Sequence, residues 1–243
     1  MIDLEALDGE RAAAEIRQRL HALAYLATGD TDQALEVLAA LAAETHVDEI
    51  LAASPPDGLL AGLVLILRAR LGRFPERTLD VLEDAIRSDV TRAVDPAAPP
   101  IDGVEERIPV LLGELRRRCL GWVLLTLPPQ RRLAWLLVEV LRVSTPIAAA
   151  MLGTTEAGLH TLLFRARKAL AEYLEPRCGH LVRPGYCTCE SRLGVALAAD
   201  FVELPEEPSL PPRPGPFASL GELYRGLVIA SPHLESLAPS GAE

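Results

Sequence analysis

Apolar residues recur at steps of three and four along the N-terminal part of the chain, the spacing that places them on one face of a helix. Residues 11–27 follow this spacing, and Gly29-Asp30 interrupts it. Thr31 or Asp32 can cap a second helix that runs to about Ala43. The same spacing predicts a short helix at 47–53, a buried apolar helix at 59–71 and a further helix after Pro75. We therefore expect a helical block.

Proline-rich stretches divide the rest of the chain. The segment 95–103, DPAAPPIDG, is typical of a linker. A second helical block follows from about Val104 to Leu174, and residues 203–216 then contain six prolines. Phe217–Leu237 has one apolar stripe, so we expect it to dock back onto the folded domains or onto a partner.

The predicted fold class is all-α, because no segment alternates in the manner of a strand and the core must be built from Leu, Ala and Val. Aromatic residues make up only 4 % of the chain. The fold is predicted to hold two helical domains joined by a linker, the second a helix-turn-helix, with a small Cys/His appendage and a C-terminal tail. The predicted boundaries are 1–94 for the first domain, 95–107 for the linker, 108–176 for the second domain, 177–192 for a metal-binding loop and 193–243 for the tail with its amphipathic helix.

Charge is unevenly distributed. The chain carries −10, yet residues 108–176 contain nine basic and five acidic residues, which gives +4 there and −14 elsewhere. A basic module in an acidic protein favours a local nucleic-acid contact, with protein contacts elsewhere. The acidic N-terminus is unlike a signal peptide, and the apolar run Leu59–Leu67 is too short to span a membrane. We therefore expect a cytoplasmic protein without a membrane partner.

The window 145–163 has the spacing of a helix-turn-helix. Ala149 allows two helices to cross closely, and Gly153 follows where the turn requires a positive φ. Thr154 or Thr155 can cap the second helix, and Pro146 is allowed in the first turn of the first helix. An ordinary helical hairpin would have a similar pattern, because small and apolar residues at this spacing are common.

In the DNA-binding interpretation, the second helix presents its N-terminal residues to the major groove and its basic residues to phosphates. A preceding pair of arginines adds backbone contacts. The predicted base-reading residues are Thr155, Glu156, His160 and Thr161, and the predicted phosphate contacts are Arg165, Arg167, Lys168, Arg131 and Arg132.

Three segments in order, LLTLPPQRR (124–132), IAAAMLG (147–153) and RARKAL (165–170), resemble the fourth conserved region of bacterial extracytoplasmic-function sigma factors. The resemblance implies recognition of an upstream promoter element within RNA polymerase holoenzyme. The chain departs from the family pattern at Pro146, where an acidic residue is usual, and at Gly158, where a polar residue is common. The reading helix has His160-Thr161-Leu162 where the family usually has a polar or basic trio.

The N-terminal block occupies the position of the family's polymerase-binding and promoter-melting region. TGDTDQALEVL (28–38) resembles the family's acidic helix, which implies that Asp32, Gln33 and Glu36 contact core RNA polymerase. Melting needs aromatic platforms, but Phe74 is the only aromatic residue between Tyr25 and Trp122. A helical bundle that only binds protein fits these residues as well as a working sigma domain does.

Four residues of metal-binding types lie close together after the second block: Cys178, His180, Cys187 and Cys189. Thiolates and imidazole suit one structural Zn²⁺ in a tetrahedral site, although a Cys-x-Cys gap is tighter than usual. Redox-active or metal-sensing thiols and an incidental cluster remain as alternatives. Cys119, beside Leu120 and Trp122, is interpreted as a buried core residue.

No nucleotide-binding loop, catalytic triad or paired-acid site stands out, so we expect no enzyme. The leading hypothesis is a sigma-like initiation factor that binds core RNA polymerase and promoter DNA, with an anti-sigma or other regulatory protein as a possible partner. The alternative is a degenerate sigma homologue that regulates transcription through protein contacts without reading promoters.

Overall fold

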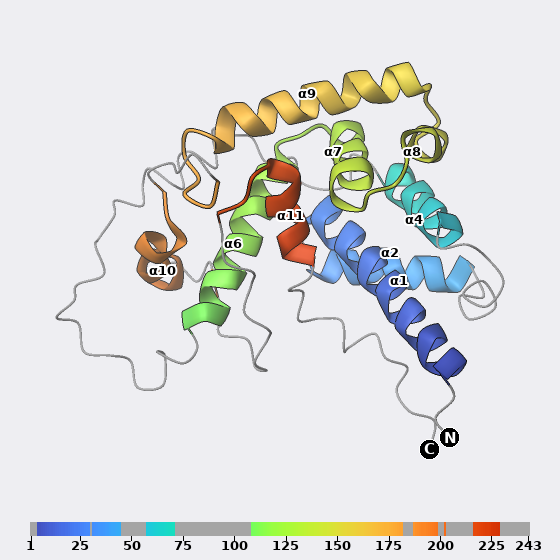
Figure 1. Cartoon of the computed structure of the whole chain (residues 1–243), viewed down its shortest axis with the longest axis horizontal. Coiled ribbons are helices and arrows are strands. Elements are labelled where there is room, and N and C mark those ends of the chain that lie inside the picture. The colour runs from blue at the N-terminus through green and yellow to red at the C-terminus, as the bar shows by residue number, and fades with distance from the viewer. Residues whose placement is uncertain are drawn as a thin grey trace. The chain divides into compact units, whose positions relative to one another are not determined.

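The computed structural model describes residues 4–29, 31–44, 57–70, 108–181, 187–198, 202 and 216–228. The N-terminal helices are α1 (Leu4–Thr28), α2 (Thr31–Glu44) and α4 (Asp57–Ala69) (Figure 1). After the undescribed stretch come α6 (Ile108–Leu125), α7 (Pro129–Trp135), the π-helical turn η2 (Leu136–Val140), α8 (Thr145–Met151), α9 (Glu156–Leu174), α10 (Cys189–Ala198) and α11 (Leu220–Val228).

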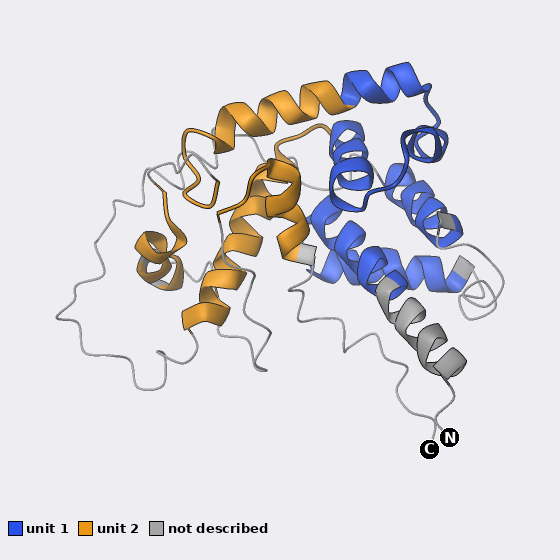
Figure 2. Ribbon diagram, in the orientation of Figure 1, with its two compact units in different colours: residues 1–75, 129–162, 233–243 blue, residues 76–128, 163–232 orange. Residues whose placement is uncertain are grey.

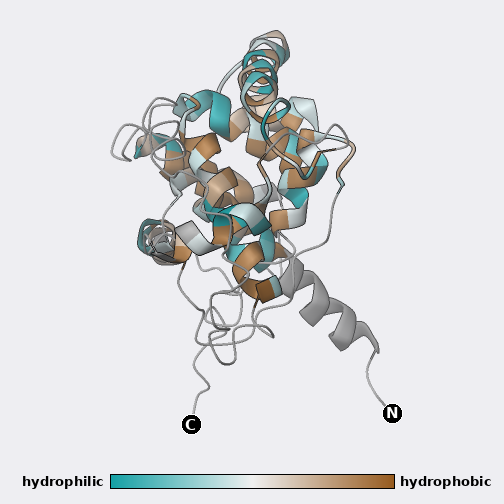
Figure 3. Cartoon of the chain, turned by 90° about the vertical axis from the view of Figure 1, so that its left-hand side faces the viewer, coloured by the Kyte–Doolittle hydropathy of each residue, from teal (hydrophilic) through white to brown (hydrophobic). Residues whose placement is uncertain are grey.

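The all-α prediction is confirmed, since the described residues form helices and only two isolated β-bridges, Cys178 with Cys187 and Leu181 with Phe217. Hydrophobic and hydrophilic residues share the same helices, as amphipathic packing requires (Figure 3). The predicted helices at 47–53 and after Pro75, the linker 95–107 and residues 203–215 lie outside the described residues.

The chain divides into two compact units that are discontinuous in sequence (Figure 2). Unit 1 comprises Met1–Pro75, Pro129–Leu162 and His233–Glu243, and unit 2 comprises Glu76–Pro128 and Leu163–Pro232. The predicted domains follow the order of the chain instead, and their boundaries stay a prediction.

In unit 1 the N-terminal helices pack against α7, η2 and α8, and α1 ends where Gly29 takes a left-handed φ of 72°. Three arginine side chains add hydrogen bonds to distant carbonyl groups. Arg19 Nη2 donates to Leu141 O at 3.0 Å, Arg68 Nη1 donates to Met151 O at 3.3 Å, and Arg132 Nη1 donates to Ala27 O. These bonds satisfy carbonyl groups at helix ends, which have no partner within their own helix.

Unit 2 is organised around α6. Leu111 and Leu115 of α6 form an apolar cluster with Leu193 and Ala196 of α10 and with Val202. On α6 itself, Glu114 accepts hydrogen bonds from Arg117 and Arg118. Burial alone would raise the pKa of Glu114, but these hydrogen bonds and positive charges bring it below the ordinary value.

The tail helix α11 docks on α6, as its apolar stripe predicted. Tyr224 donates its hydroxyl proton to Leu120 O at 3.1 Å, and the start of α11 resembles a capping box. There, Ser219 Oγ accepts from the Glu222 N–H and Glu222 Oε2 accepts from the Ala218 N–H. The buried stripe consists of Leu220, Leu223, Tyr224 and Leu227.

Among the described helices, none is by itself long and apolar enough to cross a membrane. Only α8 and α9 taken together reach that length and composition, and the pair is bent by 94°.

Candidate nucleic-acid interface

Helices α8 and α9 form the predicted helix-turn-helix. Their axes differ by 94°, within the usual range for this motif. Gly153 adopts φ +60°, as expected for the turn, and Thr154 N–H donates to Ala149 O at 3.0 Å. Pro146 lies in the first turn of α8, where its missing N–H costs no helical hydrogen bond.

Small and apolar side chains of both helices are buried. Ala148 and Ala149 are buried on α8, Leu152 is buried in the turn, and Leu159 and Leu163 are buried on α9. Burial at these positions agrees with the apolar spacing of the window, and the direct contact between the two helices stays a prediction.

Thr154 and Thr155 immediately precede α9, and Thr155 caps it. Thr155 Oγ1 accepts a hydrogen bond from the Gly158 N–H at 3.1 Å, which is an N-cap interaction. A side chain at position 158 would overlap Thr154 Oγ1. This close approach gives a structural reason for glycine where the sigma family commonly has a polar residue.

The predicted base-reading residues all lie on the surface: Thr155, Glu156, His160 and Thr161 are exposed. Phe164, one turn after His160 and Thr161, is 65 % exposed. Sequence reasoning missed Phe164, because a phenylalanine in an amphipathic helix is ordinarily assigned to the core. An exposed aromatic ring beside polar side chains can contact a thymine methyl group.

The predicted phosphate contacts of α9 are also on the surface. Arg165, Arg167 and Lys168 are exposed. Lys168 Nζ lies 3.7 Å from Glu172 Oε1, and both side chains are more than 60 % exposed. Such an exposed pair contributes little to stability, so it leaves Lys168 able to turn toward a phosphate.

The predicted phosphate contact at Arg132 is wrong. Its side chain is only 2 % exposed and donates to Ala27 O, 105 residues away in the chain. This hydrogen bond holds the Arg132 side chain in the interior of unit 1. Arg132 is therefore not on the surface, where it could contact the DNA backbone. Arg131 beside it is half-buried and keeps that predicted role.

This difference gives a paired stability prediction. Arg132→Ala should lower the free energy of unfolding by about 1–3 kcal/mol, because it removes a buried charge-assisted hydrogen bond. Arg131→Ala should leave stability nearly unchanged and lower the salt dependence of DNA binding by about one charge. Urea unfolding and DNA titrations at several salt concentrations measure both effects. Equal stability of the two variants would contradict the structural role of Arg132.

The predicted polymerase contacts lie on α2. Asp32 and Glu36 are exposed, and Gln33 is half-buried. Glu36 Oε2 is 3.8 Å from Arg70 Nη1, at the end of α4. Their role in binding polymerase stays a prediction.

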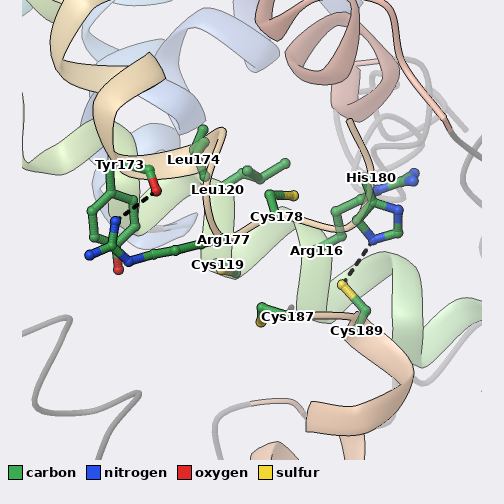
Figure 4. A pocket seen from close by; sticks show the side chains of 10 residues that line it. All are labelled: Arg116, Cys119, Leu120, Tyr173, Leu174, Arg177, Cys178, His180, Cys187 and Cys189. Carbon is green, nitrogen blue, oxygen red and sulfur yellow. Dashed lines mark hydrogen bonds between the residues drawn. The ribbon is translucent and has the colours of Figure 1, made fainter. Parts of the chain in front are cut away.

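The Cys/His residues gather around a cavity of about 50 Å³ in unit 2. Cys178 and Cys187 are joined by backbone hydrogen bonds, with Gly179 N–H donating to Cys187 O at 2.9 Å and Cys187 N–H donating to Arg177 O at 2.8 Å. His180 Nε2 and Cys189 Sγ are hydrogen-bonded at 3.2 Å (Figure 4). Cys119 of α6 lines the same cavity, a placement that its apolar sequence neighbours did not indicate.

Burial and neighbouring sulfur atoms suppress ionisation of these thiols. Burial and then Cys187 and Cys178 raise the pKa of Cys119 to about 12. Burial raises the pKa of Cys189 further, and Cys119 is its strongest sulfur neighbour. Burial and Arg116 lower the pKa of His180. Among the described residues, no three His, Cys, Asp or Glu side chains are already arranged to hold a metal ion, and the predicted zinc site stays a prediction.

The motif geometry places the chain among proteins with a helix-turn-helix that can enter a DNA groove. Residues 117–170 match the family model described as Sigma-70, region 4. This confirms the resemblance to region 4 and covers α7, η2 and α8 together with parts of α6 and α9. The resemblance of residues 28–38 to the family's acidic helix lies outside the match and stays a prediction. No curated protein matches the chain, and no solved structure does. Region 4 belongs to transcription factors rather than enzymes, and it binds promoter DNA and core RNA polymerase.

Proposed function

We propose that this chain is a sigma-like transcription initiation factor that binds core RNA polymerase and recognises promoter DNA through α8 and α9. The observation that carries the proposal is the exposed face of α9 after the Gly153 turn, within the segment that matches region 4. Core polymerase and promoter DNA are cytoplasmic in bacteria, so the protein would act there.

In this proposal the N-terminal half of α9 enters the major groove. Thr155, His160 and Thr161 contact base edges through hydroxyl and imidazole groups, and Phe164 contacts a thymine methyl group. The Thr155 cap leaves the other N–H groups at the start of α9 directed toward a phosphate. Arg165, Arg167 and Lys168 follow on the same helix and neutralise phosphates.

Polymerase binding is proposed to use Asp32, Gln33 and Glu36 on α2, with region 4 as a second contact. An exposed acidic pair on a short helix suits a basic surface on the partner. A regulatory protein of the anti-sigma kind would compete for the same surfaces.

A second candidate is a degenerate sigma homologue that regulates transcription through protein contacts alone. Two observations favour it: Phe74 is the only aromatic residue between Tyr25 and Trp122, and α1 and α4 pack against region 4 elements within unit 1. A chain without aromatic platforms is poorly equipped to hold single-stranded DNA.

The deciding experiment adds purified protein to core polymerase and selects bound sequences from a promoter library. An initiation factor should enrich one motif and support transcription from it. Thr155→Ala, His160→Ala and Thr161→Ala should each relax preference at one position, by up to about 1–3 kcal/mol. Glu175→Ala, just beyond α9, serves as the control. Polymerase binding with no enriched motif would instead support the protein-binding regulator.

A further inference from the structure

A cavity in unit 2 is surrounded by sulfur from three different parts of the chain. Cys119 comes from the middle of α6, Cys178 and Cys187 come from the β-bridge after α9, and Cys189 begins α10. All four are free cysteines, and His180 lies beside them (Figure 4). Soft thiolate ligands at this density are typical of a site for a thiophilic metal ion.

We propose that Cys119, Cys178, Cys187 and Cys189 bind one Zn²⁺ ion, and that His180 supports the site by hydrogen bonding to Cys189 Sγ rather than by ligating the metal. This set differs from the Cys/His set that the local spacing predicts, because it takes its fourth ligand from α6. Binding exchanges four thiol protons for one Zn²⁺, so four protons are released to solvent.

The placement of the cysteines carries the choice of ligands. Cys178 and Cys187 lie side by side in the β-bridge, where Gly179 N–H donates to Cys187 O and Cys187 N–H donates to Arg177 O. Cys119 of α6 and Cys189 at the start of α10 line the same cavity, so all four thiols border one space.

The contact between His180 and Cys189 fits a supporting role. His180 Nε2 and Cys189 Sγ lie 3.2 Å apart and are joined by a hydrogen bond. Metal-binding side chains are commonly oriented by a hydrogen bond from a neighbouring group that does not itself bind the metal.

Charge balance also favours four thiolates. Zn²⁺ with four thiolates carries −2, whereas three thiolates and a neutral imidazole leave −1. Arg116, only 3 % exposed, and Arg177 both line the cavity. Two guanidinium groups offset −2, and this compensation lowers the cost of burying the charged complex. Glu190, the acidic neighbour, is exposed to solvent.

The cavity of about 50 Å³ has room for an ion, and rotation of thiol side chains is needed for the sulfur atoms to converge on it. A bound ion would join α6 to the segment after α9 and to the start of α10. Metal binding should therefore raise the thermal stability of the protein.

The test uses the full chain purified under reducing conditions. Metal analysis after equilibration with Zn²⁺ should give about one ion per chain, and the Co²⁺-substituted protein should have the absorption spectrum of a four-thiolate site. Because this spectrum is measured on the unmutated protein, the test remains valid even if a cysteine variant fails to fold. A metal-free protein, a disulfide, or a spectrum of three thiolates and one imidazole would overturn the proposal.

Variants distinguish the proposed four-cysteine site from the site of three cysteines and His180. Cys119→Ala and Cys187→Ser should lose the ion at stoichiometric Zn²⁺, while His180→Ala should keep it with affinity lowered by about 10–100-fold. Circular dichroism checks that each variant is helical. If Cys119→Ala binds as tightly as the unmutated protein and His180→Ala loses the ion, the site is the Cys/His set and the role of Cys119 is refuted.

Discussion

Replacing Arg165, Arg167 and Lys168 together by alanine should flatten the salt dependence of DNA binding by about two to three units in log K against log [salt]. All three side chains are exposed on α9, beyond the base-reading residues. Each phosphate contact releases condensed counterions, so loss of three contacts removes that part of the slope. The affinity should fall uniformly across DNA sequences, because phosphates carry no sequence information.

Phe164→Ala is the matched control for this experiment. It lies on the same exposed stretch of α9 but is uncharged, so it should weaken binding without changing the salt slope. Alanine is a strong helix former, which keeps α9 intact in both variants. An unchanged slope in the triple variant would mean that these residues do not contact phosphates.

Leu63→Ala in α4 should lower the free energy of unfolding by about 2–5 kcal/mol. Leu63 is fully buried, and α4 packs against α7 and α8 within unit 1. If unit 1 unfolds cooperatively, the substitution should also reduce hydrogen-exchange protection in α8, far along the chain. Leu65→Ala, on the same helix but 64 % exposed, should have little effect on either measurement.

The exchange pattern also tests the predicted division of the chain into sequential domains. In sequential domains, α8 would keep its protection when α4 is destabilised. In unit 1, the hydrogen bond from Arg68 to Met151 O joins the two helices directly, and both should lose protection together. Full protection of α8 in Leu63→Ala would contradict cooperative unfolding of unit 1.

The helix-turn-helix could be predicted from sequence because its determinants are local. The turn depends on the backbone freedom of Gly153, and the start of α9 depends on the Thr155 cap. Ala149 and the leucines of the motif are buried, as their apolar spacing indicates. Each signal acts within a few residues. The amphipathic tail was likewise predictable, since one apolar stripe requires a partner surface.

Only the tertiary structure decided whether several individual side chains are buried and what they contact. Arg132 and Arg131 are equivalent in sequence, but only Arg132 is buried against Ala27. Cys119 resembles a core residue until α6 is placed beside the bridge that joins Cys178 and Cys187. By itself, the sequence determined the all-α class, the DNA-binding motif and the order of its charged and polar residues. The burial of a charge and the gathering of distant thiols depend on contacts between remote segments, and helical periodicity carries no information about which remote segment will be the partner.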